Sequence, residues 1–239
     1  MMLNIIIFIL IIILIIIYYN SIINNICYKE PEYFIYKGKE EGSTILIIGA
    51  THGNEPSGYF AIKEYMAKLN SQELFLKRGK IIFIPVVNYC GLQLNRRNHN
   101  TVGDINRLYD ITNKNIINKL IADFTNTSDF IIDFHEGYEY ANNPYNSLGS
   151  TITPSDTNLA ETVANKVVEN INKNIDIDYK KFKINKDKNI MGSLRDYSIK
   201  LNYLLVETTG QNNIQPIEIR VNQCINVINT VLDYFNSYK

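Results

Sequence analysis

The chain has 239 residues, of which 46% are hydrophobic, and its 24 basic and 24 acidic residues balance. This length is enough for one domain with a sizeable core. The lysines and arginines are scattered among acidic residues and asparagines, which argues against nucleic acid as a partner because such a partner needs a clustered basic surface. The three cysteines show no paired spacing. This argues against both a disulfide framework and a thiolate zinc cluster, so any metal ion must use other ligands.

An apolar segment opens the chain: MMLNIIIFILIIILIIIYYN is almost entirely apolar from Ile5 to Tyr19. A helix needs about 17–20 such residues to cross a bilayer. No Lys or Arg precedes the segment and no small-residue cleavage site follows it, which favours a retained single-pass membrane anchor over a cleaved signal peptide. Cleavage would instead give a secreted or exported protein. A buried core helix is disfavoured because every face is apolar. We expect an anchor over residues 1–20, a linker over 21–32 and a folded domain over 33–239.

Four apolar runs of strand length follow, at 43–49, 80–88, 128–134 and 202–207. Apolar residues recur at helical spacing after each of the four runs. Strands that are apolar on both faces and alternate with amphipathic helices indicate a three-layer α/β/α fold with a mostly parallel central sheet. Ligands of such sheets bind beyond the carboxyl ends of the strands. The helical stripes comprise Tyr59, Ile62, Met66 and Leu69; Ile116, Leu120 and Phe124; Leu159, Val163, Val167 and Ile171; and Ile225, Ile228, Leu232 and Phe235.

Ionisable side chains follow three of these runs. The first run leads to His52 and Glu55, the third to His135, and the fourth to Glu207. A hydrolytic zinc site takes three ligands from His, Asp and Glu and leaves the fourth position to water. His52, Glu55 and His135 would supply that set. Glu55 comes directly before Pro56, a residue type that suits the first position of a helix. The same spacing is also compatible with an ordinary loop.

Further polar residues in these loops are suited to catalysis and substrate binding. Glu207 stands in LLVETTGQ, where partial burial would raise the pKa of its carboxyl group and suit a general base; a turn carboxylate is the alternative. In DINR, Asn106 and Arg107 offer an amide and a planar fork for a substrate carboxylate. Either Arg96 or Arg97 could polarise a scissile carbonyl. Each arginine is also compatible with a surface position.

Four motifs in this order, HGNE followed by Gly58, DINR, DFH and VETTG, resemble the succinylglutamate desuccinylase and aspartoacylase group within the zinc carboxypeptidase superfamily. The resemblance covers roughly residues 43–235. It implies a mixed, mostly parallel sheet between helices. It also implies one Zn²⁺ ion held by His52, Glu55 and His135.

By position, the resemblance assigns roles to the remaining motif residues. Arg97, seven residues before Asp104, would polarise the scissile carbonyl, and Asp104 would support the site. Asn106 and Arg107 would bind the free carboxylate of the substrate. Glu207 would act as general base and acid. Little chain follows Glu207, so we expect the additional C-terminal β-domain of aspartoacylases to be lacking and the site to be open to a larger N-acyl amino acid or a peptide.

Two departures from the family pattern affect these roles. V-G-D stands before the INR motif where many members have G-V-D, and Arg96 adjoins Arg97, so the choice of the carbonyl-polarising arginine stays open between the two. HEGYEY follows the third ligand in place of the small or hydroxyl residues found in several members. Tyr138 is therefore a candidate substrate contact, as is Arg96.

The sequence thus predicts a zinc-dependent hydrolase in residues 33–239 that cleaves an amide next to a free carboxylate. Glu207 would take a proton from zinc-activated water. Deacylation of N-acyl amino acids and C-terminal cleavage of peptides are equal candidates for the reaction. Two competing hypotheses are a membrane-tethered binding module that keeps the pocket without turnover and an α/β scaffold in which the histidines are incidental. The sequence leaves the oligomeric state open.

Overall fold

The computed structural model describes residues 2–27, 29–111, 114–141, 147–186, 190–210 and 213–235. Within these residues, seven strands form one sheet in the order β1-β3-β2-β4-β7-β5-β6. β1 pairs antiparallel with β3 and β5 pairs antiparallel with β7, whereas the other neighbours are parallel. The sheet is therefore mixed and mostly parallel, as the sequence predicts. The strands are β1 Phe34–Lys37, β2 Glu40–Ile48, β3 Arg78–Ile84, β4 Phe130–Gly137, β5 Thr151–Pro154, β6 Lys183–Ile184 and β7 Tyr203–Thr209.

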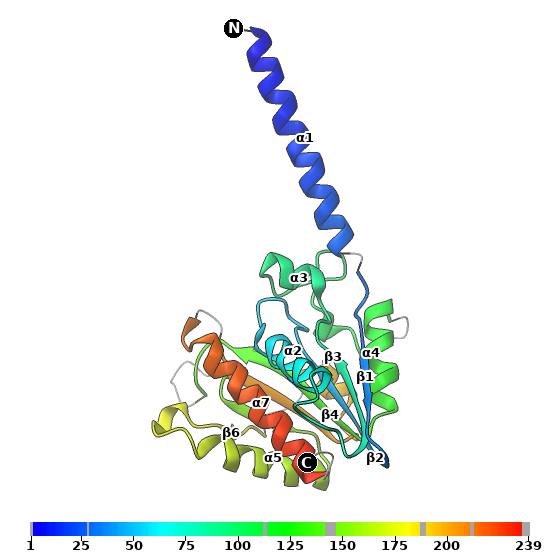
Figure 1. Ribbon diagram of the computed structural model, residues 1–239. Helices are drawn as coiled ribbons and strands as arrows, with labels where there is room; N and C mark the ends of the chain where they lie inside the picture. Colours follow the sequence, from blue (N-terminus) through cyan, green and yellow to red (C-terminus); the bar gives the residue numbers. More distant parts are fainter. Residues whose placement is uncertain are drawn as a thin grey trace.

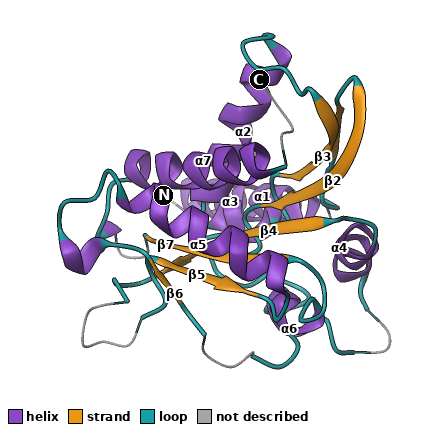
Figure 2. Ribbon diagram, turned by 90° about the horizontal axis from the view of Figure 1, so that it is seen from below, coloured by secondary structure: helices purple, strands orange, loops and turns teal. Residues whose placement is uncertain are grey.

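Helices cover both faces of the sheet and give the three layers seen in Figure 2. On one face, α2, α5 and α7 form a core cluster with Ile45 and Ile47 of β2. On the other, α4 and α6 pack on Leu46 and Ile48 of the same strand. Successive side chains of a strand point to opposite faces, so the continuous apolar run of β2 supplies both cores. The helices are α1 Met2–Cys27, α2 Ser57–Asn70, α3 Tyr89–Leu94, α4 Ile116–Asn126, α5 Asn158–Asn172, α6 Leu194–Tyr197 and α7 Ile217–Tyr234, with 3₁₀ turns η1 Ile105–Arg107 and η2 Asp178–Lys180.

The four apolar runs predicted as strands are the four adjacent strands β3, β2, β4 and β7. The sequence analysis did not identify β1, β5 and β6, which lie at the two margins of the sheet. β1 and β5 have four residues each and β6 has two. Such short strands carry too few residues for a clear period-two pattern. The predicted fold class is confirmed, and the additional strands only extend the sheet.

The predicted core stripe of α4 is wrong at Ile116, which is 59% exposed. Ile117 and Ile121 face the core instead. Two adjoining rows of this helix are apolar, so helical spacing alone did not distinguish them. The central residues of the other stripes are confirmed as buried, namely Ile62, Met66, Val163, Val167, Ile228 and Leu232.

Two glycines, one in the loop between β2 and α2 and one at the start of α2, allow close approaches of this part of the chain to its neighbours. A Cβ atom on Gly53 would lie 1.8 Å from the carbonyl carbon of Gly91 in α3, and one on Gly58 would lie 2.3 Å from the Cβ atom of Phe134 in β4. Only a residue without a side chain allows such close approaches. The loop that carries the first two candidate ligands is therefore held between α3 and β4.

The N-terminal helix α1 projects away from the sheet and the other helices (Figure 1). Its segment Ile5–Ile22 is long and apolar enough to cross a membrane, and none of that segment is buried in the domain. The helix continues to Cys27, which forms a disulfide with Cys90 of α3. This bond corrects the argument from spacing against disulfides. The two cysteines are 63 residues apart, and they meet only because the end of α1 lies against α3.

Candidate metal centre

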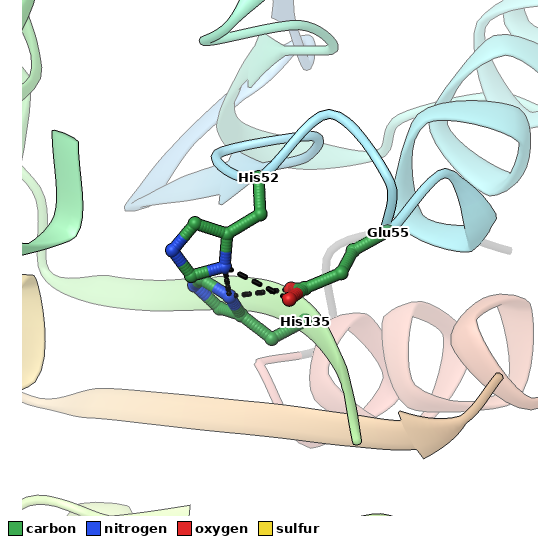
Figure 3. Close-up of side chains that lie close together, drawn as sticks. All are labelled: His52, Glu55 and His135. Carbon is green, nitrogen blue, oxygen red and sulfur yellow. Dashed lines mark hydrogen bonds and ion pairs between the residues drawn. The ribbon is translucent and has the colours of Figure 1, made fainter. Parts of the chain in front are cut away.

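Three buried side chains, two from the loop between β2 and α2 and one from strand β4, converge on one point (Figure 3). His52 follows β2, Glu55 precedes α2, and His135 lies in β4. The Nδ1 atom of His52 is 3.0 Å from Oε1 of Glu55, and the Nδ1 atom of His135 is 2.9 Å from Oε2 of the same carboxylate. The two Nδ1 atoms are 3.0 Å apart. Two imidazole nitrogens and a carboxylate that face each other in a buried place form a donor set that fits zinc.

Each of the two histidines also has its own carboxylate neighbour at the Nε2 atom, which orients the ring. Asp104 Oδ1 lies 3.2 Å from Nε2 of His52, and Asp133 Oδ2 lies 3.2 Å from Nε2 of His135. A carboxylate at Nε2 favours a proton there and leaves Nδ1 free to bind a metal ion. Asp133 also accepts a hydrogen bond of 2.8 Å from the hydroxyl group of Tyr203. Asp104 was expected to support the site, and the structure places it beside His52.

Opposite charges set the protonation of this cluster. Burial opposes ionisation of Glu55, but the charge of His52 and a hydrogen bond from His135 hold its pKa well below the usual range. Burial also disfavours the charged form of His135, but the neighbouring Asp133 and Glu55 carboxylates raise its pKa well above the usual value. Glu55 and His135 therefore favour each other's charged forms.

Glu207 of β7 stands directly opposite His135 in the parallel β4–β7 ladder. Its side chain is buried, and burial raises the pKa of the carboxyl group to about 8, although the charge of His135 lowers it. A carboxyl group with a pKa near neutrality is suited to exchange a proton in both directions. The burial expected for Glu207 from the sequence is therefore present.

These pKa shifts predict how the stability of the metal-free protein depends on pH. The pKa of Glu207 rises from 4.5 to about 8 on folding, so its contribution to stability is lost as the pH rises from the lower to the higher value. The raised pKa of His135 acts in the same direction, because this histidine stabilises the fold only while it is protonated. We expect the metal-free chain to lose up to about 1.4 kcal/mol per pH unit through Glu207 in this range.

Urea unfolding in detergent and chelator at pH 6 and pH 8 measures this effect. The Glu207→Gln variant removes one titrating group and is expected to show a smaller difference between the two pH values than the wild type. An equal difference in the two proteins would contradict the assigned burial of Glu207.

The cluster lies in a cavity of about 410 Å³ that contains most of the predicted substrate-binding residues. Arg97 lines it, and its guanidinium contacts Asp104 at 3.1 Å and Glu55 at 3.3 Å. Asn106 and Arg107 of η1 also line it. Tyr138 lies at the exposed rim, with 44% of its surface accessible. The structure thus brings Arg97, Asn106, Arg107 and Tyr138 together with the candidate ligands.

Arg96 does not line this cavity. It is exposed and borders a surface hollow together with Arg97, Asn98, His99, Asn100 and Gly103. Of the two arginines, only Arg97 also lines the cavity of the candidate ligands.

Two further residues of the site are not predicted by the sequence motifs. Arg195 in α6 is buried, lines the cavity and donates a hydrogen bond of 3.3 Å to the carbonyl oxygen of Pro154; no motif pointed to it. Asp133 was missed although it stands two residues before His135 in DFH. Residues i and i+2 of a strand share a face, so this spacing was a usable signal.

Glu136 follows His135 in the chain, but its side chain contacts α7 and the start of α2. Its carboxylate contacts Arg220 of α7 and accepts a hydrogen bond of 2.7 Å from the backbone N–H of Ser57 at the start of α2. Glu136 of β4 is thereby joined to α7 by an ion pair and to the N-terminal end of α2 by a hydrogen bond. The position of the loop that precedes α2 is thereby fixed from behind.

A mixed α/β/α sheet with a buried His-Glu-His cluster at the carboxyl ends of its parallel strands defines the class of protein as an α/β domain with a candidate metal centre. More narrowly, the chain belongs to the succinylglutamate desuccinylase/aspartoacylase catalytic domain family, whose sequence model matches residues 41–170. This matched part contains the three candidate ligands. Glu207 lies outside it.

Comparison with individual proteins supports the same relationship. Over 103 residues, the chain is 29% identical to N-alpha-acetyl-L-2,4-diaminobutyric acid deacetylase from Halomonas elongata, a match that covers 41% of this chain and 29% of the relative. The chain thus spans less than a third of that curated protein.

Solved structures show the same fold. Tripeptide-bound Csd4, a cell shape determinant protein of Helicobacter pylori, superposes with a TM-score of 0.74 at 18% identity, covering 88% of this chain and 56% of that one. A succinylglutamate desuccinylase/aspartoacylase from Rhodobacter sphaeroides gives 0.60 at 20% identity, with 87% and 60% covered. The product-bound ectoine utilization protein EutE (DoeB) from Ruegeria pomeroyi gives 0.63 at 18% identity, with 87% and 61% covered. These similarities establish the fold.

Proposed function

We propose that the protein is a zinc-dependent hydrolase that cleaves an amide bond next to a free carboxylate. The observation that carries this proposal is the convergence of His52, Glu55 and His135 beside Glu207 in one cavity. Membership in a family named for a desuccinylase and an acylase supports it. When bound, zinc would lower the pKa of water and polarise the scissile carbonyl.

The residues around the cluster would have the other roles in catalysis. Glu207 takes a proton from the attacking water and returns it to the leaving amine. Arg97 donates hydrogen bonds to the oxygen on which negative charge develops. Asp104 and Asp133 hold the imidazoles of His52 and His135 in the ligand tautomer.

Asn106 and Arg107 would bind the free carboxylate of the substrate. The Asn106 Oδ1 atom accepts a hydrogen bond of 2.8 Å from the backbone N–H of Leu194, so its NH₂ group is the part left to donate to a carboxylate. Arg107 donates 2.6 Å to the backbone oxygen of Asn106 through Nη1, which orients its guanidinium within the cavity. A carboxylate between an amide donor and an arginine is held in one orientation.

The substrate class follows from the size of the cavity and from the relatives. A cavity of about 410 Å³ has the size of a small-molecule site. One relative is named as a deacetylase of an N-acetyl amino acid, and one structure of similar fold contains a tripeptide. We propose a small N-acyl amino acid or a short peptide as substrate.

We also propose that α1 is a membrane anchor. The apolar segment Ile5–Ile22 supports this assignment. The proposed division of the chain is an anchor over residues 1–20, a linker over 21–32 and a catalytic domain over 33–239. The helix itself continues to Cys27, so most of the proposed linker is helical.

The test is a screen of the zinc-loaded chain against N-acyl amino acids and against short peptides with free or amidated C-termini. We expect kcat/KM for the amidated substrate to be roughly 10²-fold lower, because Arg107 then loses its charged partner. Arg107→Ala is expected to lower kcat/KM for the free carboxylate by a similar factor and to leave the amidated substrate unaffected. Equal cleavage of both substrates by the wild type would remove the role of Arg107.

A further inference from the structure

The junction between α1 and the domain is held by contacts at several points. Cys27 and Cys90 are joined by the disulfide. Immediately after the helix, Lys29 lies 4.2 Å from the ring centre of Tyr89, the first residue of α3, and Glu32 accepts a hydrogen bond of 2.9 Å from the hydroxyl group of the same tyrosine. The end of α1 is therefore fixed against α3.

His99 adds a connection from a second loop. It is the one histidine of the three that lies outside the metal cluster, and it is buried in the junction. Its Nδ1 atom accepts a hydrogen bond of 3.2 Å from the backbone of Thr101, and its ring also hydrogen-bonds the backbone of Cys27. The loop 95–103, which carries Arg97, is thus attached to the same helix end as α3.

These contacts determine where the domain would stand relative to a membrane. Cys27 lies five residues beyond Ile22, the end of the apolar segment, which corresponds to about 7.5 Å along a helix. The headgroup region on each side of a bilayer is about 5–7 Å thick. If α1 spans the bilayer, Cys27 and the adjoining α3 and loop 95–103 therefore lie at the outer boundary of the lipid headgroups.

The part of the surface at this boundary carries side chains of the kind that bind phosphate. Arg96 is exposed and borders a hollow of about 460 Å³ whose lining also includes Arg97, Asn98, His99, Asn100 and Gly103. An arginine fork with neighbouring amide donors is suited to a phosphate group. No role in the metal cavity accounts for Arg96.

We propose that the surface formed by α3 and the loop 95–103, here named the junction surface, binds anionic lipid headgroups and is held there by the Cys27–Cys90 disulfide. This proposal rests on the anchor assigned to α1 above. Disulfides persist on the oxidising side of a membrane, so the domain lies on that side. Because Gly53 contacts Gly91 and Arg97 belongs to the loop 95–103, the metal cavity is then held next to the membrane.

Energy transfer from a single tryptophan measures this orientation, since the chain contains no tryptophan of its own. Gln93→Trp places a probe at an exposed position of α3, and Tyr179→Trp places a matched probe at an exposed position of η2. η2 precedes β6, which Figure 1 shows far from α1. The full chain is reconstituted into phosphatidylglycerol vesicles that contain a dansyl-labelled headgroup lipid.

We expect transfer from Gln93→Trp to be several-fold higher than from Tyr179→Trp. In the Cys27→Ser/Cys90→Ser background the difference is expected to shrink, because the domain is then free to tilt. Adding Arg96→Gln, or replacing phosphatidylglycerol by phosphatidylcholine, is expected to reduce transfer from Gln93→Trp. Equal transfer from the two probes in the wild type would overturn the proposal, as would insensitivity to both Arg96→Gln and lipid charge.

Two controls separate this proposal from the proposed function. If alkaline carbonate extracts the chain from membranes, the anchor is wrong and the junction surface with it, although hydrolysis is unaffected. If the chain stays in the membrane but iodoacetamide labels Cys27 and Cys90 without a reductant, the disulfide is wrong. Zinc content and turnover of a soluble substrate by Cys27→Ser/Cys90→Ser are expected to equal those of the wild type.

Discussion

Glu207→Gln is expected to lower kcat by roughly 10²–10⁴-fold, the range that a general base contributes, while the zinc content stays unchanged. Gln has the shape of Glu but accepts no proton, and Glu207 is not among the three residues that converge as candidate ligands. The measurements are steady-state kinetics on the substrate found in the screen and metal analysis of the same preparations.

The matched control is Glu73→Gln, the same change at an exposed position after α2, for which wild-type kinetics are expected. Undiminished turnover by Glu207→Gln would show that another group transfers the proton. A wild-type protein that binds one zinc ion but hydrolyses none of the screened substrates would instead support the binding module that retains the pocket.

Removal of a histidine ligand is the second change with a large expected effect. His135→Ala is expected to weaken zinc binding by roughly 10²-fold or more and to abolish hydrolysis, because each of a few ligands carries a substantial share of the binding free energy of about 10–16 kcal/mol of a structural zinc site. His135 is buried and its Nδ1 atom faces both other candidate ligands. Zinc titration against a competing chelator measures the affinity.

The chain offers its own control for this experiment, since it contains three histidines and one of them lies outside the cluster. His99→Asn is expected to keep one equivalent of zinc at wild-type affinity. Loss of zinc in His99→Asn together with retention in His135→Ala would refute the ligand set. His52→Ala is expected to behave like His135→Ala.

The central sheet could be predicted from the sequence because its strands have helices on both faces. β4, for example, is buried at all eight positions, and apolar residues occupy both of its faces. β1 could not be recognised in this way, since its burial pattern is exposed at three of four positions. The choice between Ile116 and Ile117 in α4 depended on the packing of the helix on the sheet, which spacing does not encode.

The candidate ligands could be found because they stand at or just beyond the carboxyl ends of apolar runs, and the parallel strands that these runs form end at one edge of the sheet. Arg195 could not, because α6 brings it to the cavity from a segment without a motif. The adjacent Arg96 and Arg97 were indistinguishable in the sequence, and only the contacts of Arg97 with Asp104 and Glu55 separate them. The Cys27–Cys90 pair likewise depends on tertiary structure.

The pairing of His135 with Glu207 across the β4–β7 ladder has a consequence for the order in which the protein folds. His52 and Glu55 are close in sequence and meet in a local turn, whereas β4 and β7 are joined by a long crossover. Contacts between such distant segments form slowly, because a large loop must be closed before they contribute stability. During folding, His52 and Glu55 would thus come together early. The complete set of candidate ligands with Glu207 would form only when β7 joins the sheet.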